Sequence, residues 1–253
     1  MKFEPSTPRS QNYKFASISH VRTQHAHVVR EIGMAIVSGD IDVGETLPSD
    51  SEMIEQFGVS RTVLREALKT IAGKGMVQAK TRIGTRVRPR EDWNFFDADL
   101  LVWHAEAGVD ELFLDQLTEM RFALEPQAAA LAAERRTDSD LAALSECVAD
   151  METSKDNNAF VLSDLRFHMA VTVASANPFM RSLSGLIEVA LYSMLTVSSP
   201  INSTERMKKS IADHRAIVRA IAARDKNAAR EAMLVVIRDG IRFAKLAQMN
   251  ITG

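Results

Sequence analysis

Residues 47–87 read LPSDSEMIEQFGVSRTVLREALKTIAGKGMVQAKTRIGTRV, and this stretch decides the fold of the N-terminal part of the chain. Ser49, followed three residues later by Glu52, is typical of a capping box and predicts the start of a short helix. Ser60 is expected to cap the next helix, whose apolar stripe runs to about Gly73. The spacing therefore predicts a helix, a tight turn and a second helix.

The segments on either side of this stretch complete a small domain. Upstream, apolar residues between Val21 and Ser38 recur at helical spacing and predict a first helix. Downstream, residues 76–89 alternate apolar and polar side chains around a turn at Gly84, which predicts a β-hairpin. Three helices and a hairpin form the minimal winged helix-turn-helix. This is the fold expected for residues 19–90.

The rest of the chain has almost no strand pattern. Seven helical segments are expected, at about 97–107, 110–134, 139–153, 157–176, 178–198, 203–223 and 226–248. The breaks between them are short, as expected for antiparallel neighbours in a bundle. The chain is therefore expected to be mostly α-helical, with a winged helix-turn-helix followed by an antiparallel helical bundle.

The length of 253 residues suits two domains better than one. The expected organisation is a flexible arm, a winged helix-turn-helix, a linker with a hinge helix, and a helical domain, at residues 1–18, 19–90, 91–108 and 109–253. Trp93 and Trp103 lie in the linker, where two interpretations stay open: interdomain packing and a hinge core that couples the two domains.

Charge is unevenly distributed along the chain. Residues 1–90 contain 14 Lys and Arg against 9 Asp and Glu, whereas the remainder contains 17 against 24. A basic first third fits a module that neutralises phosphates. No apolar run reaches the length of a membrane span, and the N-terminus lacks the apolar segment of a secretory signal. We therefore expect no membrane partner and a cytoplasmic location.

The second helix of the helix-turn-helix opens with SRTVLREALK, so its first turn is basic. A recognition helix enters the major groove with its N-terminus, and the wing approaches the minor groove or its phosphates. The residues expected to contact double-stranded operator DNA are Ser60, Arg61, Thr62, Arg65, Arg82, Gly84 and Thr85. The alternative is a solvated amphipathic helix followed by a surface hairpin.

Metal-ligating residue types occur at a helical spacing in the second domain. Asp164 and His168 are four residues apart and share a helical face, and His214 lies on a later helix that can face them across a bundle. Carboxylate and imidazole ligands suit Zn, Mn or Ni. The alternative is a surface pair or a hydrogen-bonded pair in the core.

Three further polar residues are candidate effector ligands. Arg121 and Glu125, four residues apart in an apolar helix, form either a mutual ion pair or a site where Arg121 binds an effector carboxylate. Asn177, before Pro178, is either a turn residue or an amide facing effector hydroxyls. Arg242 is either an effector ligand or a surface arginine.

The motifs together resemble a known family. The run from residue 36 to residue 87 is similar to the winged-helix domain of the GntR family of bacterial transcription regulators. RFALEPQAAALAAER, DLRFHMAVTVASANP and DHRAIVRAIAARDKNAAREAM resemble the FCD sensor domain of its FadR-type subgroup. The resemblance covers about residues 21–248 and implies that residues 19–90 are a DNA-binding domain and residues 109–253 an effector-binding and dimerisation domain. Within the subgroup, REDWNFFDADLLVW and the helical pattern look most like repressors of galactonate catabolism.

The resemblance implies roles for several of these residues. FCD domains typically hold a divalent metal with an Asp, a His four residues later and two further His, and Asp164, His168 and His214 match the first three. Val236 stands where the fourth ligand is usual, so a metal would have open positions or bind weakly, or the effector alone would use these groups. The resemblance supports Arg121 as a carboxylate ligand. The position of Ser51 is often Arg in the family, so one DNA contact is expected to be missing or different.

The sequence thus predicts a homodimeric repressor that a small carboxylate effector, with galactonate first among the sugar acids, releases from its operator. Activation instead of repression stays open. One alternative is a metal-dependent enzyme of sugar-acid metabolism fused to a DNA-binding arm, although no general base accompanies the trio. Another is a DNA-architectural protein without a ligand.

Overall fold

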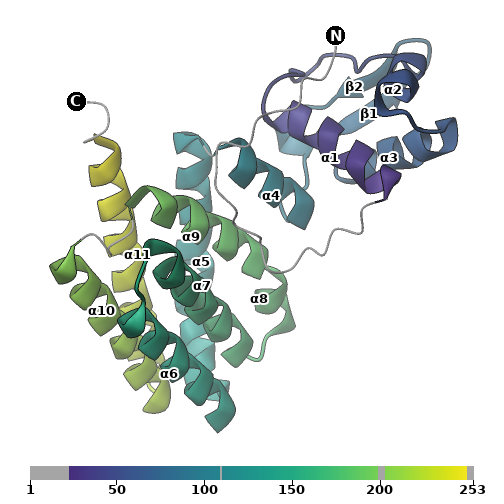
Figure 1. The fold of residues 1–253 in the computed structure, drawn as a ribbon. Coiled ribbons are helices and arrows are strands. Elements are labelled where there is room, and N and C mark those ends of the chain that lie inside the picture. Colours follow the sequence, from purple (N-terminus) through teal and green to yellow (C-terminus); the bar gives the residue numbers. More distant parts are fainter. Residues whose placement is uncertain (1–22, 109, 199–202, 250–253) are drawn as a thin grey trace. The chain divides into compact units, whose positions relative to one another are not determined.

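A computed structural model describes residues 23–108, 110–198 and 203–249, and the predicted arm at residues 1–18 lies outside them. The chain divides into two compact units, Met1–Val109 and Asp110–Gly253 (Figure 1). The mostly helical fold class is confirmed. Among the helices of the described part of the chain, none is both long enough and apolar enough to cross a membrane.

The N-terminal unit is the predicted winged helix-turn-helix. Its elements are α1 (Gln24–Val37), α2 (Asp50–Phe57), α3 (Arg61–Gly73), β1 (Val77–Lys80) and β2 (Gly84–Val87). The capping box at Ser49 is present, and the Ser60 hydroxyl accepts a bond from the backbone N–H of Val63. The two strands pair antiparallel, with Val77 opposite Val87. The helix-turn-helix and hairpin predictions are confirmed.

Apolar side chains from all three helices and the hairpin form one core, and Ile32, Leu64, Ile71 and Met76 in it are fully buried. Met76 and the buried Val77 join the hairpin to this core, so the wing is anchored at its base. A β-bridge between Thr46 and Arg86 holds the chain before α2 against β2, a contact that the sequence did not predict.

The segment after the wing packs onto the same core. It contains a short 3₁₀ helix, Arg90–Asp92, and α4 (Ala98–Ala107), which contacts α1. Trp93 and Trp103 are buried in the core of this unit, and the Trp103 ring lies so close to Gly33 that a Cβ there would overlap it. Residues 91–108, expected as a linker and hinge helix, therefore form part of the winged-helix unit. The coupling role of α4 stays a prediction.

A buried lysine fastens this segment to the end of α3. The Lys74 ammonium lies 2.7 Å from carboxylate oxygens of both Asp97 and Asp99 and 5.5 Å from the centre of the Trp103 ring. Burial lowers the pKa of Lys74, but hydrogen bonds to the two carboxylates outweigh it and raise the pKa above its usual value. Lys74 is therefore a charged contact between α3 and α4.

The C-terminal unit is all-helical in its described residues. Its elements are α5 (Glu111–Arg135), α6 (Asp138–Thr153), α7 (Asn157–Ala174), α8 (Pro178–Ser182), α9 (Ser184–Ser198), α10 (Thr204–Ala222) and α11 (Lys226–Met249). Of the seven segments predicted after residue 96, six are single helices, and the first of them is α4 of the N-terminal unit. The remaining segment, 178–198, is two helices, because the Leu183 N–H bonds to carbonyls two and three residues back and tightens the chain out of α-helical register.

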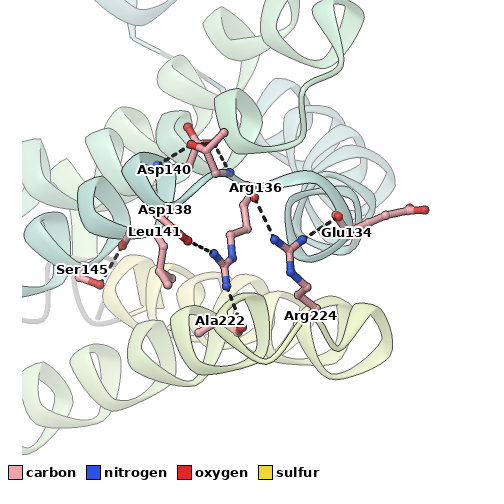
Figure 2. A network of polar contacts seen from close by, with 9 residues as sticks. Glu134, Arg136, Asp138, Asp140, Leu141, Ser145, Ala222 and Arg224 are labelled. Atoms are coloured by element: carbon pink, nitrogen blue, oxygen red, sulfur yellow. Dashed lines mark hydrogen bonds and ion pairs between the residues drawn. The ribbon is translucent and has the colours of Figure 1, made fainter.

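The long helix α5 is central to the bundle and contacts α7, α9, α10 and α11 (Figure 1). Two arginines tie the end of α5 to the end of α10 (Figure 2). Arg136 donates to the backbone oxygen of Ala222 at 3.0 Å, and Arg224 donates to that of Glu134 at 3.0 Å. Helix C-terminal carbonyls lack intrahelical donors, so these bonds satisfy them and fix the two helix ends together.

Candidate functional site

The first turn of α3 presents a basic, solvent-facing surface. Arg61, Thr62 and Arg65 are all exposed, and Arg61 and Arg65 share one face because they are four residues apart. The Ser60 hydroxyl is partly engaged as the helix cap. The free N–H groups and the positive end of the helix dipole add to the attraction for a phosphate.

The wing carries the second group of candidate DNA contacts. Arg82 has a left-handed backbone (φ 63°) in the turn and is exposed, as is Gly84, whereas Thr85 is half-buried. Lys80, opposite Gly84 in the hairpin, is also exposed and was not singled out from the sequence. The basic residues on both sides of the turn were the sequence feature that could have identified Lys80. Arg86 donates to the carbonyl of Gly44, so part of its guanidinium is already engaged.

A buried polar cluster lies inside the helical bundle. Asp164 and His168, one turn apart on α7, and His214 on α10 are 4%, 1% and 1% exposed, and one ligand-type atom from each lies within 4.8 Å of the others. The structure thus brings together the three residues that the sequence proposed as metal ligands. The trio is a candidate metal site of two imidazoles and one carboxylate.

Both histidines direct Nε2 into this cluster, because Nδ1 of each ring is bonded to another group. His168 Nδ1 bonds to the Glu125 carboxylate and His214 Nδ1 bonds to the backbone oxygen of Ser210 at 2.7 Å, and both partners only accept. The hydrogen of each neutral ring therefore lies on Nδ1, and Nε2 carries a lone pair.

The two Nε2 atoms are buried without a hydrogen-bond partner among the described residues, 3.2 Å (His214) and 3.8 Å (His168) from oxygens of Asp164. Lone pairs that converge in a buried space repel one another, and a positive charge among them relieves this repulsion, whether it is a metal ion or a proton on His214 facing Asp164. The donor set therefore fits a divalent metal.

The charges of the cluster follow from opposing effects. Burial alone would raise the pKa of Glu125, but the Arg121 charge and His168 lower it to about 2. Burial likewise raises the pKa of Asp164, and the neighbouring His214 outweighs it and lowers that pKa. Burial lowers the pKa of His214, and Asp164 raises it above its usual value. Two carboxylates are therefore ionised inside the bundle at neutral pH.

The remaining predicted site residues fall in different environments. Arg121 is buried and pairs with Glu125, so the ion pair of the first interpretation is formed. Asn177 caps α8, with its side-chain oxygen accepting from the Phe179 N–H at 3.0 Å, as in the turn interpretation. Arg242 is exposed on α11, as a surface arginine would be. Val236 is half-buried and packs against the apolar core.

One member of the cluster was missed by sequence reasoning. Glu125 was considered as a partner of Arg121, and its bond to His168 was not anticipated. The residues lie 43 positions apart on α5 and α7, and no spacing pattern connects them. One indication of this contact was present in the sequence: Glu125 lies in an apolar helix with Arg121 as its only cationic neighbour on that helix, so a second partner from another helix could have been expected.

These features define a class: a protein with a winged-helix DNA-binding unit and a helical ligand-binding unit. The model of the bacterial regulatory proteins of the gntR family matches residues 24–87, and that of the FCD domain matches residues 116–239. The chain belongs to the GntR family of transcriptional regulators and carries an FCD effector-binding domain. The family and the relatives are regulators, and the enzyme alternative has no support among them.

Two relatives from Escherichia coli K12 cover most of the chain. The uncharacterized HTH-type transcriptional regulator YieP is 37% identical over 83% of this chain and 91% of its own. The galactonate operon transcriptional repressor is 32% identical over 86% and 95%. A solved structure titled as Lar of Listeria monocytogenes has a TM-score of 0.60 at 20% identity, over 89% of this chain and 98% of that chain, and shares the fold.

Proposed function

We propose that this regulator is a homodimeric cytoplasmic repressor that a small hydroxy-carboxylate, with galactonate as the first candidate, releases from its operator. The observation that carries the proposal is the buried Asp164, His168 and His214 cluster, in which both Nε2 atoms lack a hydrogen-bond partner among the described residues. The similarity to the galactonate operon repressor supports the choice of effector. Another relative, 27% identical, is named as the Glc operon transcriptional activator, so activation is the alternative response.

On the DNA side, the proposed contacts are the predicted residues of α3 and the wing, with Lys80 added. Two recognition helices related by a twofold axis match a palindromic operator and strengthen a modest single-site affinity. An effector that couples to DNA binding by about 1–3 kcal/mol would change operator affinity roughly 5–150-fold.

On the sensor side, Asp164, His168 and His214 would hold Zn, Mn or Ni. The bound ion would supply positive charge and open positions for effector oxygens. Val236, in the place of the usual fourth ligand, offers no donor atom, so three protein ligands leave more of the coordination sphere to the effector or to water. Arg121, Asn177 and Arg242 remain candidates for direct effector contact, and of these Arg121 is already engaged with Glu125.

Replacing Arg65 with Ala is expected to weaken operator binding about ten- to hundredfold, because the exposed guanidinium on the recognition helix contacts a base edge or phosphate. Operators are first selected from a pool of random duplexes, and affinity is then measured by fluorescence anisotropy at several salt concentrations. Arg219→Ala, which removes an exposed arginine from α10 of the other unit, is the matched control. Equal effects of the two substitutions would contradict this DNA surface.

Metal and effector binding are expected to raise the melting temperature of chelator-treated protein, because both bind the native state preferentially. Zn, Mn and Ni chlorides are tested alone and with galactonate, other sugar acids and dicarboxylates. His214→Ala is expected to abolish the metal-dependent rise. If the metals stabilise the protein and no hydroxy-carboxylate does, the proposed effector class is wrong. If only the carboxylates stabilise it, the effector binds without a metal.

A further inference from the structure

We propose that Glu125 is the positioning residue of the sensor site: it holds the His168 ring so that Nε2 faces Asp164 and His214, and Arg121 acts on the site through it. The metal-affinity part of this inference rests on the proposed function, whereas the ring orientation does not.

The Glu125 carboxylate is fixed from two helices at once. It is 1% exposed, and one oxygen accepts from Arg121 Nε on its own helix while the other accepts from His168 Nδ1 on α7. A second guanidinium nitrogen of Arg121 lies 3.5 Å from the oxygen that faces His168. A carboxylate bound to a guanidinium offers only lone pairs, so His168 must place its hydrogen on Nδ1. The lone pair of Nε2 is thereby directed into the cluster.

The two histidines of the cluster differ in what orients them. His214 Nδ1 donates to the backbone oxygen of Ser210, four residues earlier on α10, so the partner of this nitrogen lies on its own helix and does not involve Glu125. His168 depends on a side chain from another helix. A substitution at residue 125 should therefore change one ring and leave the other as an internal control. Partners of this kind typically change metal affinity 10–100-fold when removed.

This arrangement also gives Arg121 a role that needs no direct contact with the effector. The Arg121 guanidinium donates to the Glu125 carboxylate, which in turn accepts from His168, so these hydrogen bonds link α5 to α7. A loss of effector response on substitution of Arg121 is then expected even where the effector never touches it. The two roles separate experimentally, because only positioning changes His168 in the absence of an effector.

The test is the ¹⁵N chemical shift of the histidine ring nitrogens in metal-free, full-length protein at mildly alkaline pH, where the shifts distinguish Nδ1–H from Nε2–H rings. Wild type is expected to show His168 as Nδ1–H. Glu125→Gln is expected to shift His168 toward a mixture of tautomers with His214 unchanged. Asp150→Asn, which removes an exposed carboxylate paired with Arg166, is the control and should change neither ring. An unchanged His168 in Glu125→Gln overturns the inference.

Glu125→Asp is the second variant, for use if Glu125→Gln does not fold. It keeps a negative charge beside Arg121 but shortens the reach to His168 by one methylene, and the same tautomer shift is expected. Titration with ZnCl₂ by calorimetry is expected to show an affinity about 10–100-fold weaker in both variants than in wild type. If wild type binds no Zn²⁺, the metal part of the proposed function fails, and the ring shifts still decide the role of Glu125.

Discussion

Arg121→Ala is expected to lower the free energy of unfolding of the helical domain by about 3–5 kcal/mol, since removing one partner of a buried ion pair leaves an uncompensated charge. Arg121 is 3% exposed and Glu125 1%, so the charge left on Glu125 lies out of contact with bulk water. Both tryptophans lie in the other unit, at positions 93 and 103. Urea denaturation followed by far-ultraviolet circular dichroism therefore reports this change, and tryptophan fluorescence should move much less.

The matched control is Arg166→Ala in the same domain. Arg166 pairs with Asp150 at 2.8 Å, but the two side chains are 53% and 41% exposed, and such surface pairs contribute about 0–1 kcal/mol. Adding Glu125→Gln to Arg121→Ala removes the stranded charge and should recover part of the lost stability. A loss in Arg121→Ala no larger than in Arg166→Ala would mean that the buried pair is not formed in solution.

Local chemistry made most of the fold predictable. Ser49 with Glu52, and Ser60 before an apolar stripe, fixed the helix starts of the helix-turn-helix, because caps act within three residues of their own position. The break at Leu183 was missed because the apolar periodicity continues through 178–198, although the Leu183 N–H bonds two and three residues back and not four. Periodicity reports which face is buried and does not report how each N–H is paired.

Tertiary partners were harder to foresee than elements. Asp164 and His168 could be placed together from helical spacing, whereas His214 joined them only as a conjecture about facing helices and through the family resemblance. Glu125 meets His168 because α5 packs on α7, and neither side chain carries a local mark of that contact. Trp103 likewise contacts Gly33 because α4 packs on α1, and no local sequence pattern reports this contact. Residues 91–108 were therefore expected to be a linker.

Gly75→Ala is expected to destabilise the winged-helix unit by several kcal/mol. Gly75 has φ +81°, a left-handed conformation that costs an L-residue roughly 1–2 kcal/mol. A Cβ there would also overlap the carbonyl oxygen of Asp92 and lie 3.2 Å from the Cα of Trp93, and forcing atoms into a packed site adds about 1–3 kcal/mol. Because Trp93 lies beside the substitution, tryptophan fluorescence during urea denaturation measures the loss directly.

Gly39→Ala separates the two causes. Gly39 has almost the same backbone angle, φ +82°, but no atom lies within 4 Å of the position that a Cβ would take, so only the conformational cost of roughly 1–2 kcal/mol applies. The difference between the two variants therefore measures how tightly the segment after the wing is held against the end of α3. Equal losses would show that residues 92–93 move away from Gly75 at little cost. A larger loss in Gly75→Ala means that this segment is held rigidly against the end of α3.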